Sequence, residues 1–167
     1  MADAWKEGGA ARAELAEKGE AGGLATILTG MGSLSYGELA GERIKLGLML
    51  HDPEEEHDCF SDNTHMSHLD DVNGIRNVWF GAYEGFGGGS AKGAALKDLV
   101  AAKDQALADE VTAKLDASLA AFEAMRERAE TVEAYDQMIG EGNEEGNAVV
   151  QAAIDALINQ TPSIERV

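Results

Sequence analysis

Cysteine, proline and aromatic residues are all scarce in this chain of 167 residues. A single cysteine excludes an intramolecular disulfide, so oxidising and reducing compartments are both compatible with the sequence. Two prolines, an aromatic content of 5% and no alternating runs of β-branched residues argue against a sheet protein. The apolar residues are mostly Ala, Leu, Ile, Val and Met, which indicates an all-α fold.

Basic residues and long apolar runs are also missing. The 13 Lys and Arg stand against 31 Asp and Glu, a formal net charge of −18. That charge repels phosphate backbones and anionic lipids, so we expect no nucleic-acid partner, whereas cations are attracted. The same acidity also keeps a helical surface soluble without any ligand. No stretch reaches the roughly 18–20 apolar residues of a membrane span, and residues 1–20 lack a signal peptide. We therefore expect a cytoplasmic protein, or one whose export signal or membrane anchor lies outside this sequence.

Apolar residues recur every three or four positions, which predicts one domain over 1–167: an antiparallel helical bundle of about four long helices with short helical connections. Residues 1–20 form a weakly packed N-terminal helix, because Gly8 and Gly9 interrupt a poor apolar stripe. The glycine-rich run 84–93 is a loop that lacks a phosphate-binding motif. The predicted helical stretches are 24–33, 35–51, 61–83, 107–125 and 149–162.

Helix boundaries are predicted from capping residues and proline. Ser35 with Glu38 three residues later forms a capping-box pattern that starts a new helix. Ser61 or Asp62 can cap the helix that follows the acidic stretch. Pro162 should end the last helix, because proline cannot donate a backbone hydrogen bond.

All four histidines and the only cysteine lie within residues 51–68. Imidazole and carboxylate groups together suit first-row metals, and a thiolate could help to hold iron, zinc or copper. Asp62, His65 and His68 are spaced by three, so a helix beginning near Asp62 would bring them within reach of one another. The alternative interpretation is a solvated acidic turn followed by a helix N-terminus, with Cys59 as a small buried apolar residue.

Residues 30–65 and 73–83 carry a family resemblance. The segments GELAGERI, EEEHDCFSDNTH and LKDLVAAKDQALADEVTAKLD occur in the same order in the imelysin family, iron-regulated envelope proteins once described as peptidases. The sequence resembles the C-terminal half of that family, from about Leu24 to the final VVQAAIDALINQ.

The resemblance implies an all-helical fold of two halves, export to the periplasm or cell envelope, and a part in iron or haem acquisition. The family's GxHxxE motif, which belongs to its N-terminal half, is missing. His51 with Glu54 is the nearest approach, but Met49 stands where the glycine should be. One copy of this sequence is thus expected to supply one wall of a site, and a homodimer or a missing N-terminal half supplies the other.

The resemblance also assigns site residues. Candidate metal ligands are Glu56, His57, Cys59, Asp62 and His65. The cleft wall is expected to include Glu42, Arg43, Phe60, Ser61, Asn63 and Thr64. His51 and His68 are interpreted as surface or incidental residues.

These observations favour a non-catalytic protein of bacterial iron uptake that binds iron, another divalent metal or a haem-related ligand. The alternative is a helical protein-protein interaction module with no metal site. A metallopeptidase, with Glu55 or Glu56 as base, is the third hypothesis, but no catalytic residue can be assigned.

Overall fold

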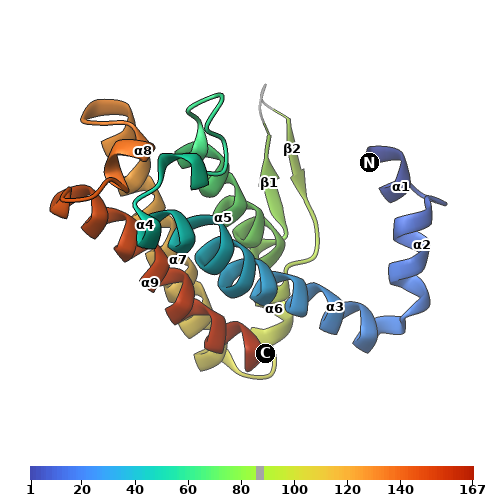
Figure 1. Cartoon of the computed structure of the whole chain (residues 1–167). Helices are drawn as coiled ribbons and strands as arrows, with labels where there is room; N and C mark the ends of the chain where they lie inside the picture. Colours follow the sequence, from blue (N-terminus) through green and yellow to red (C-terminus); the bar gives the residue numbers. More distant parts are fainter. Residues whose placement is uncertain (86–88) are drawn as a thin grey trace.

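A computed structural model describes residues 1–85 and 89–167. The long helices pack together, as Figure 1 shows, and the prediction of an all-α bundle is confirmed. In chain order the elements are α1 (Ala2–Trp5), α2 (Ala10–Glu17), α3 (Gly19–Ser33), the π-helix η1 (Leu34–Lys45), α4 (Leu46–Leu50), the 3₁₀-helix η2 (Pro53–Glu55), α5 (Thr64–Phe80), β1 (Ala82–Glu84), β2 (Ser90–Lys92), α6 (Leu96–Ala101), α7 (Gln105–Thr131), α8 (Tyr135–Met138) and α9 (Glu144–Glu165).

The first long segment is one uninterrupted run of helix through α3, η1 and α4. The predicted stop at 30–33 and the predicted start at Ser35 are therefore both wrong. Ser35 is buried inside the run, where its hydroxyl donates to the Met31 carbonyl oxygen at 2.7 Å and accepts from the Gln160 amide at 2.8 Å. A capping-box pattern cannot reveal this, because the residue that holds Ser35 in place lies on α9.

The helices α7 and α9 run antiparallel, and the core shows why. Phe122 and Met125, late in α7, pack in one cluster with Val150 and Ile154, early in α9. The other cluster combines the start of α7 with Ile164 at the end of α9. Side-chain caps fix where both helices begin. Asp104 accepts a hydrogen bond from the Leu107 N–H, and Asn143 accepts one from the Gly146 N–H, both at 2.9 Å.

Helix α9 continues beyond Pro162 to Glu165, so the predicted stop at this proline is wrong. Pro162 is exposed, and water can solvate the carbonyl that it leaves without a donor. The predicted start of α5 at Ser61 or Asp62 is also early, because the helix begins at Thr64, and Asn63 makes no side-chain cap.

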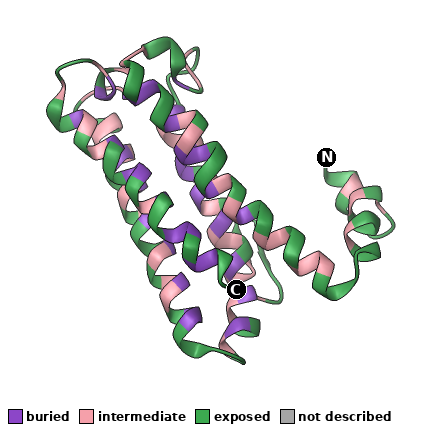
Figure 2. Cartoon of the chain, turned by 60° about the horizontal axis from the view of Figure 1, so that its bottom comes forward, coloured by how far each residue is buried: buried purple, intermediate pink, exposed green. Residues whose placement is uncertain are grey.

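The first two helices project from the bundle as an arm (Figure 1). Neither α1 nor α2 contains a buried residue, and Figure 2 shows this part of the chain without the purple of the bundle core. Gly8 adopts φ +76° in the break between them. The structure thus has two short helices without buried residues where a single N-terminal helix was predicted, and the domain assignment 1–167 stays a prediction.

A two-stranded antiparallel hairpin follows α5, which helical periodicity did not predict. Ala82, Tyr83 and Glu84 pair with Lys92, Ala91 and Ser90. Part of the predicted loop 84–93 is therefore strand, while 86–88 lie outside the described residues. Within the described ranges, no helix combines the length and apolarity that a bilayer crossing requires.

Candidate functional site

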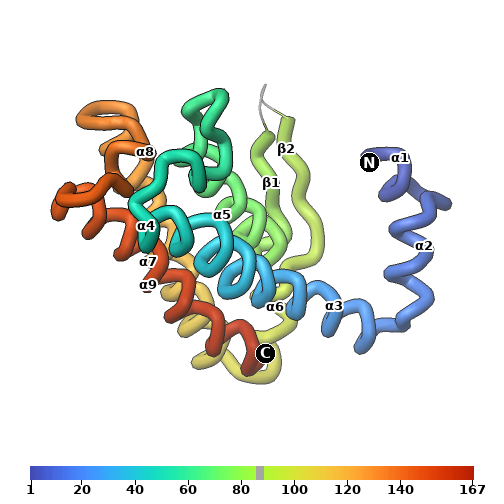
Figure 3. Tube along the Cα trace, viewed as in Figure 1, coloured from blue at the N-terminus to red at the C-terminus, as the bar shows by residue number. Residues whose placement is uncertain are grey.

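The 51–63 loop, which joins α4 to α5, lies near the turn from α7 through α8 into α9 (Figure 3). His51 ends α4 in the left-handed conformation at φ 53°, which agrees with the predicted end of the 35–51 stretch, and Pro53 opens η2 two residues later. The His51 Nδ1 donates to the Ile139 carbonyl oxygen at 2.8 Å, which ties the loop to the end of α8. The Asp52 carboxylate accepts from the Glu54 N–H at 2.9 Å. The loop therefore has a defined geometry at its start.

Thr64 organises the second half of the loop. Its hydroxyl donates to the Glu56 carboxylate at 2.9 Å and accepts from the Asp58 N–H at 3.0 Å. The Asp58 carboxylate in turn accepts a hydrogen bond from the Ser67 hydroxyl on α5. Glu56 is buried, and burial raises the pKa of its carboxyl, against the lowering effect of the bond from Thr64. A carboxylate is thus drawn into the protein and held by a single side-chain donor.

His68 is the most unusual residue of this region. It is 0% exposed, and neither ring nitrogen has a hydrogen-bond partner. Its ring centroid lies 6.1 Å from that of His57, and 5.7 Å from that of Tyr135 of α8 in an edge-to-face arrangement. Burial lowers the pKa of His68 to about 3, and the charges of His57 and Arg43 add to this effect. The imidazole is therefore neutral at physiological pH, the form that binds a metal.

Arg43 links η1 to this side of α5. Its guanidinium contacts the Asp71 carboxylate at 2.8 Å and the Glu38 carboxylate at 3.3 Å. Asp71 is one helical turn after His68, and burial raises the pKa of its carboxyl, opposed by the charge of Arg43. The π-helix is rare and frequently lies at functional sites, and this one supplies the guanidinium that pairs with Glu38 and Asp71.

The structure separates the predicted ligands rather than gathering them. Glu56 is buried, Cys59 and His65 are half-buried, and His57 and Asp62 are exposed. His65 Nδ1 is itself buried without a partner. Among the residues that the structure describes, no three His, Cys, Asp or Glu side chains are close enough to hold a metal. The five-residue metal site stays a prediction, and it would need rearrangement of the loop.

The six residues expected to form the cleft wall also differ in their exposure. Thr64 is buried and Arg43 is half-buried, so both belong to the structural support of the loop. Phe60 is fully exposed, so its aromatic side chain has no packing role within the chain. The other three residues, which are also exposed, are Glu42, Ser61 and Asn63.

The interpretation of His68 as a surface or incidental residue is wrong. Its position contained the signal: His68 precedes Val72, Ile75 and Trp79 by 4, 7 and 11 residues, and all three are buried on the same face of α5. Tyr135 was also missed as a neighbour. Its contact joins α8 to α5 across 67 positions of sequence, a distance over which helical spacing carries no information.

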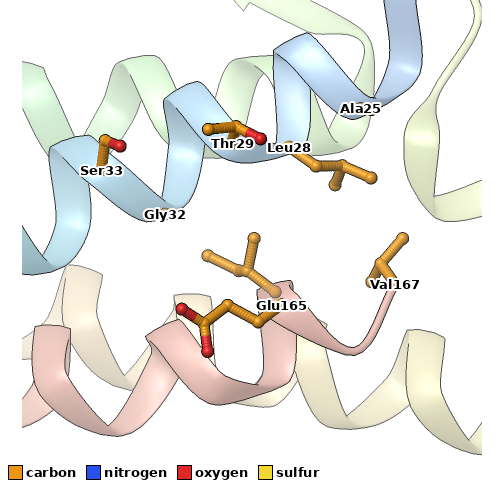
Figure 4. Close-up of a pocket in the computed structure, with 8 residues that line it drawn as sticks. Ala25, Leu28, Thr29, Gly32, Ser33, Glu165 and Val167 are labelled. Atoms are coloured by element: carbon orange, nitrogen blue, oxygen red, sulfur yellow. The ribbon is translucent and has the colours of Figure 1, made fainter. Parts of the chain in front are cut away.

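A separate hollow of about 360 Å³ lies between α3 and the end of α9, far from the 51–63 loop. Figure 4 shows Thr29 and Leu28 facing Glu165 and Val167 across it. Among the residues that line the hollow, Glu165 has the one ionisable side chain and none is a histidine.

The fold and site together define a class: a mostly helical bundle protein whose α4–α5 loop carries imidazole and carboxylate groups around a buried histidine. Within that class, the chain belongs to the Imelysin family, whose family model matches residues 1–164. The resemblance carried by GELAGERI and EEEHDCFSDNTH is thereby confirmed, and the match begins well before Leu24. No curated protein matches the sequence.

Proposed function

We propose that this protein binds iron, another divalent metal or a haem-related ligand in bacterial iron uptake, without catalysing a reaction. The observation that carries the proposal is the set of histidines around the 51–63 loop whose ring nitrogens are buried and unpaired. Native proteins rarely leave such atoms without a partner, and a bound ion is one of the ordinary reasons for the exception. Family membership and a net charge of −18 support the same conclusion.

The decisive measurement is calorimetric titration of the metal-free protein with Fe(II), Fe(III) and Zn(II). We expect saturable binding to the wild type, and loss of binding in a double variant, His57→Ala with His65→Ala. A matched control is His51→Gln, since the His51 Nδ1 is already engaged with the Ile139 carbonyl. Negligible heats of binding in both the wild type and the double variant would contradict the metal-binding proposal.

We further propose that a second chain completes the site. His57 and Phe60 are both exposed, and one chain does not gather three metal ligands within the described residues. A homodimer, or an N-terminal half supplied separately, would place donors opposite these residues. Sedimentation that gives only a 17.6 kDa monomer at micromolar concentration, with and without metal, would contradict the homodimer.

The proposed location is the periplasm or cell envelope, on the basis of the family. Cell fractionation with an antibody against the protein would test it, and recovery in the cytoplasmic fraction alone would contradict it.

A second candidate function is a protein-protein interaction module that needs no metal. The observation that favours it is an apolar surface on η1 and α4, where Tyr36, Leu46, Met49 and Leu50 are 43–66% exposed. Binding of a defined partner that survives chelation, and that is lost on Met49→Asp, would support this function over the metal site. The control substitution Lys45→Asp changes an exposed residue of neighbouring η1 without removing apolar surface.

A further inference from the structure

Burial of the His68 side chain costs free energy that no hydrogen bond within the described residues offsets. A neutral imidazole has one N–H donor and one acceptor nitrogen, and here both are buried without a partner. Each such group loses its hydration on folding without gaining a hydrogen bond in return. A phenylalanine would fill the same place against Tyr135 without this cost. The presence of histidine at this position therefore favours a bound ligand that an imidazole nitrogen can contact.

The nearest candidate to share such a partner is His57. It comes from the loop rather than from α5, and its ring lies 6.1 Å from that of His68 with 31° between the planes. With metal–nitrogen bonds of about 2.0–2.1 Å, two imidazoles on one tetrahedral ion have centroids roughly 5 Å apart. A small movement of the 51–63 loop would thus suffice for both rings to bind the same ion.

The charges around the pair are compatible with a cation. Asp58, whose carboxylate is held by Ser67, lies near enough to His68 to stabilise positive charge there. The positive charge of Arg43 disfavours a cation at His68, but two carboxylates already pair with its guanidinium. A ligating histidine commonly uses its second nitrogen to donate to a nearby oxygen, and the hydroxyl of Tyr135, whose ring contacts His68, is buried without a partner of its own.

We propose that His68 is the inner ligand of a divalent metal site that it shares with His57, and that the site takes a divalent first-row ion, such as Fe(II), in preference to Fe(III). Imidazole nitrogen suits borderline divalent ions, whereas ferric iron favours a set of anionic oxygen ligands. His57 is at the surface, so the remaining coordination positions are open to water or to a donor from a second chain. The inference rests on the proposed metal-binding function and assigns to it a residue outside the expected ligand set.

The test uses the full chain under anaerobic conditions, with Co(II), Zn(II), Fe(II) and Fe(III) as probes. His68→Phe keeps an aromatic ring against Tyr135 and removes both nitrogens, and we expect it to fold and to bind Co(II) at least about 100-fold more weakly. His57→Ala should have a similar effect, whereas His51→Gln should bind like the wild type. Cadmium NMR of protein with nitrogen-labelled histidine identifies the ligands directly, and we expect coupling to His57 and His68.

Each result decides between distinct outcomes. Absence of metal binding by the wild type would overturn the proposed function and this site with it. Binding that is lost in His57→Ala but unchanged in His68→Phe, or cadmium coupling to His57 and His65 alone, would overturn only the role of His68. Preference for Fe(III) over Fe(II) would contradict the assigned ion. If His68→Phe failed to fold, the cadmium couplings in the wild type would still decide the question.

Discussion

At the scale of single residues, His68 should control the acid stability of the metal-free protein. Its pKa is about 3 in the folded chain and about 6.5 when unfolded, so the unfolded state takes up the proton first as pH falls. The free energy of unfolding should therefore decrease from near pH 6.5 downward because of this residue, by several kcal/mol in total. Above pH 6.5 both states hold a neutral imidazole and the contribution is constant.

The matching measurement is urea unfolding of the wild type and His68→Phe in chelator between pH 4 and pH 8, a range that brackets the ordinary histidine pKa of about 6.5. The stability advantage of the variant should grow as pH falls. Parallel pH curves for the two proteins would show that the imidazole is not buried as the structure has it.

Thr64 is the second residue with a measurable effect. Its hydroxyl is the side-chain donor to the buried Glu56 and the acceptor for the Asp58 N–H. Thr64→Val removes both bonds while it keeps the shape, and should reduce the unfolding free energy by about 1–3 kcal/mol. Thr64→Ser is the control, because it keeps the hydroxyl and should lose much less. Equal losses in both variants would mean that the methyl group, rather than the hydrogen bonds, stabilises this position.

At the scale of elements, the contact between η1 and α9 depends on a buried polar pair. Gln160 donates to the Ser35 hydroxyl at 2.8 Å, and both side chains are 0% exposed. Ser35→Ala leaves the Gln160 amide without this acceptor and should cost about 1–3 kcal/mol in chemical unfolding. Ser33→Ala, two residues earlier and exposed, should leave stability unchanged within about 0.5 kcal/mol. Similar results for the two variants would contradict a structural role for the pair.

The same elements show what the sequence could predict. Apolar spacing was sufficient for α5 and α7, because their buried residues repeat every three or four positions over long stretches. The start predicted at Ser35 failed because a polar residue that caps a helix and one that pairs with a distant helix have the same local pattern. The helix end predicted at Pro162 was wrong for a related reason, because the exposure of this residue on α9 makes the lost hydrogen bond tolerable.

The site was predictable only in part, and for a physical reason. The concentration of histidine and carboxylate in 51–68 located the region, and the family resemblance is confirmed. Which residues converge depends on how the loop packs on α5 and α8. The contact of His68 with Tyr135, and the pairing of Arg43 with Asp71, both cross between elements and leave no local trace.

At the scale of the whole molecule, the net charge of −18 should appear as a salt dependence of metal binding. The acidic surface raises the local concentration of cations, and added salt screens it: the Debye length falls from about 30 Å at 0.01 M to about 10 Å at 0.1 M. Over this range Co(II) affinity should fall several-fold in a salt with a weakly coordinating anion. Glu123→Lys with Glu127→Lys, both exposed on α7, should weaken binding at low salt and much less at high salt, because the two substitutions reduce the negative charge of the chain and salt screens that effect. An affinity that is independent of salt in all these proteins would mean that the imidazole ligands act alone and that the acidity of the chain serves solubility.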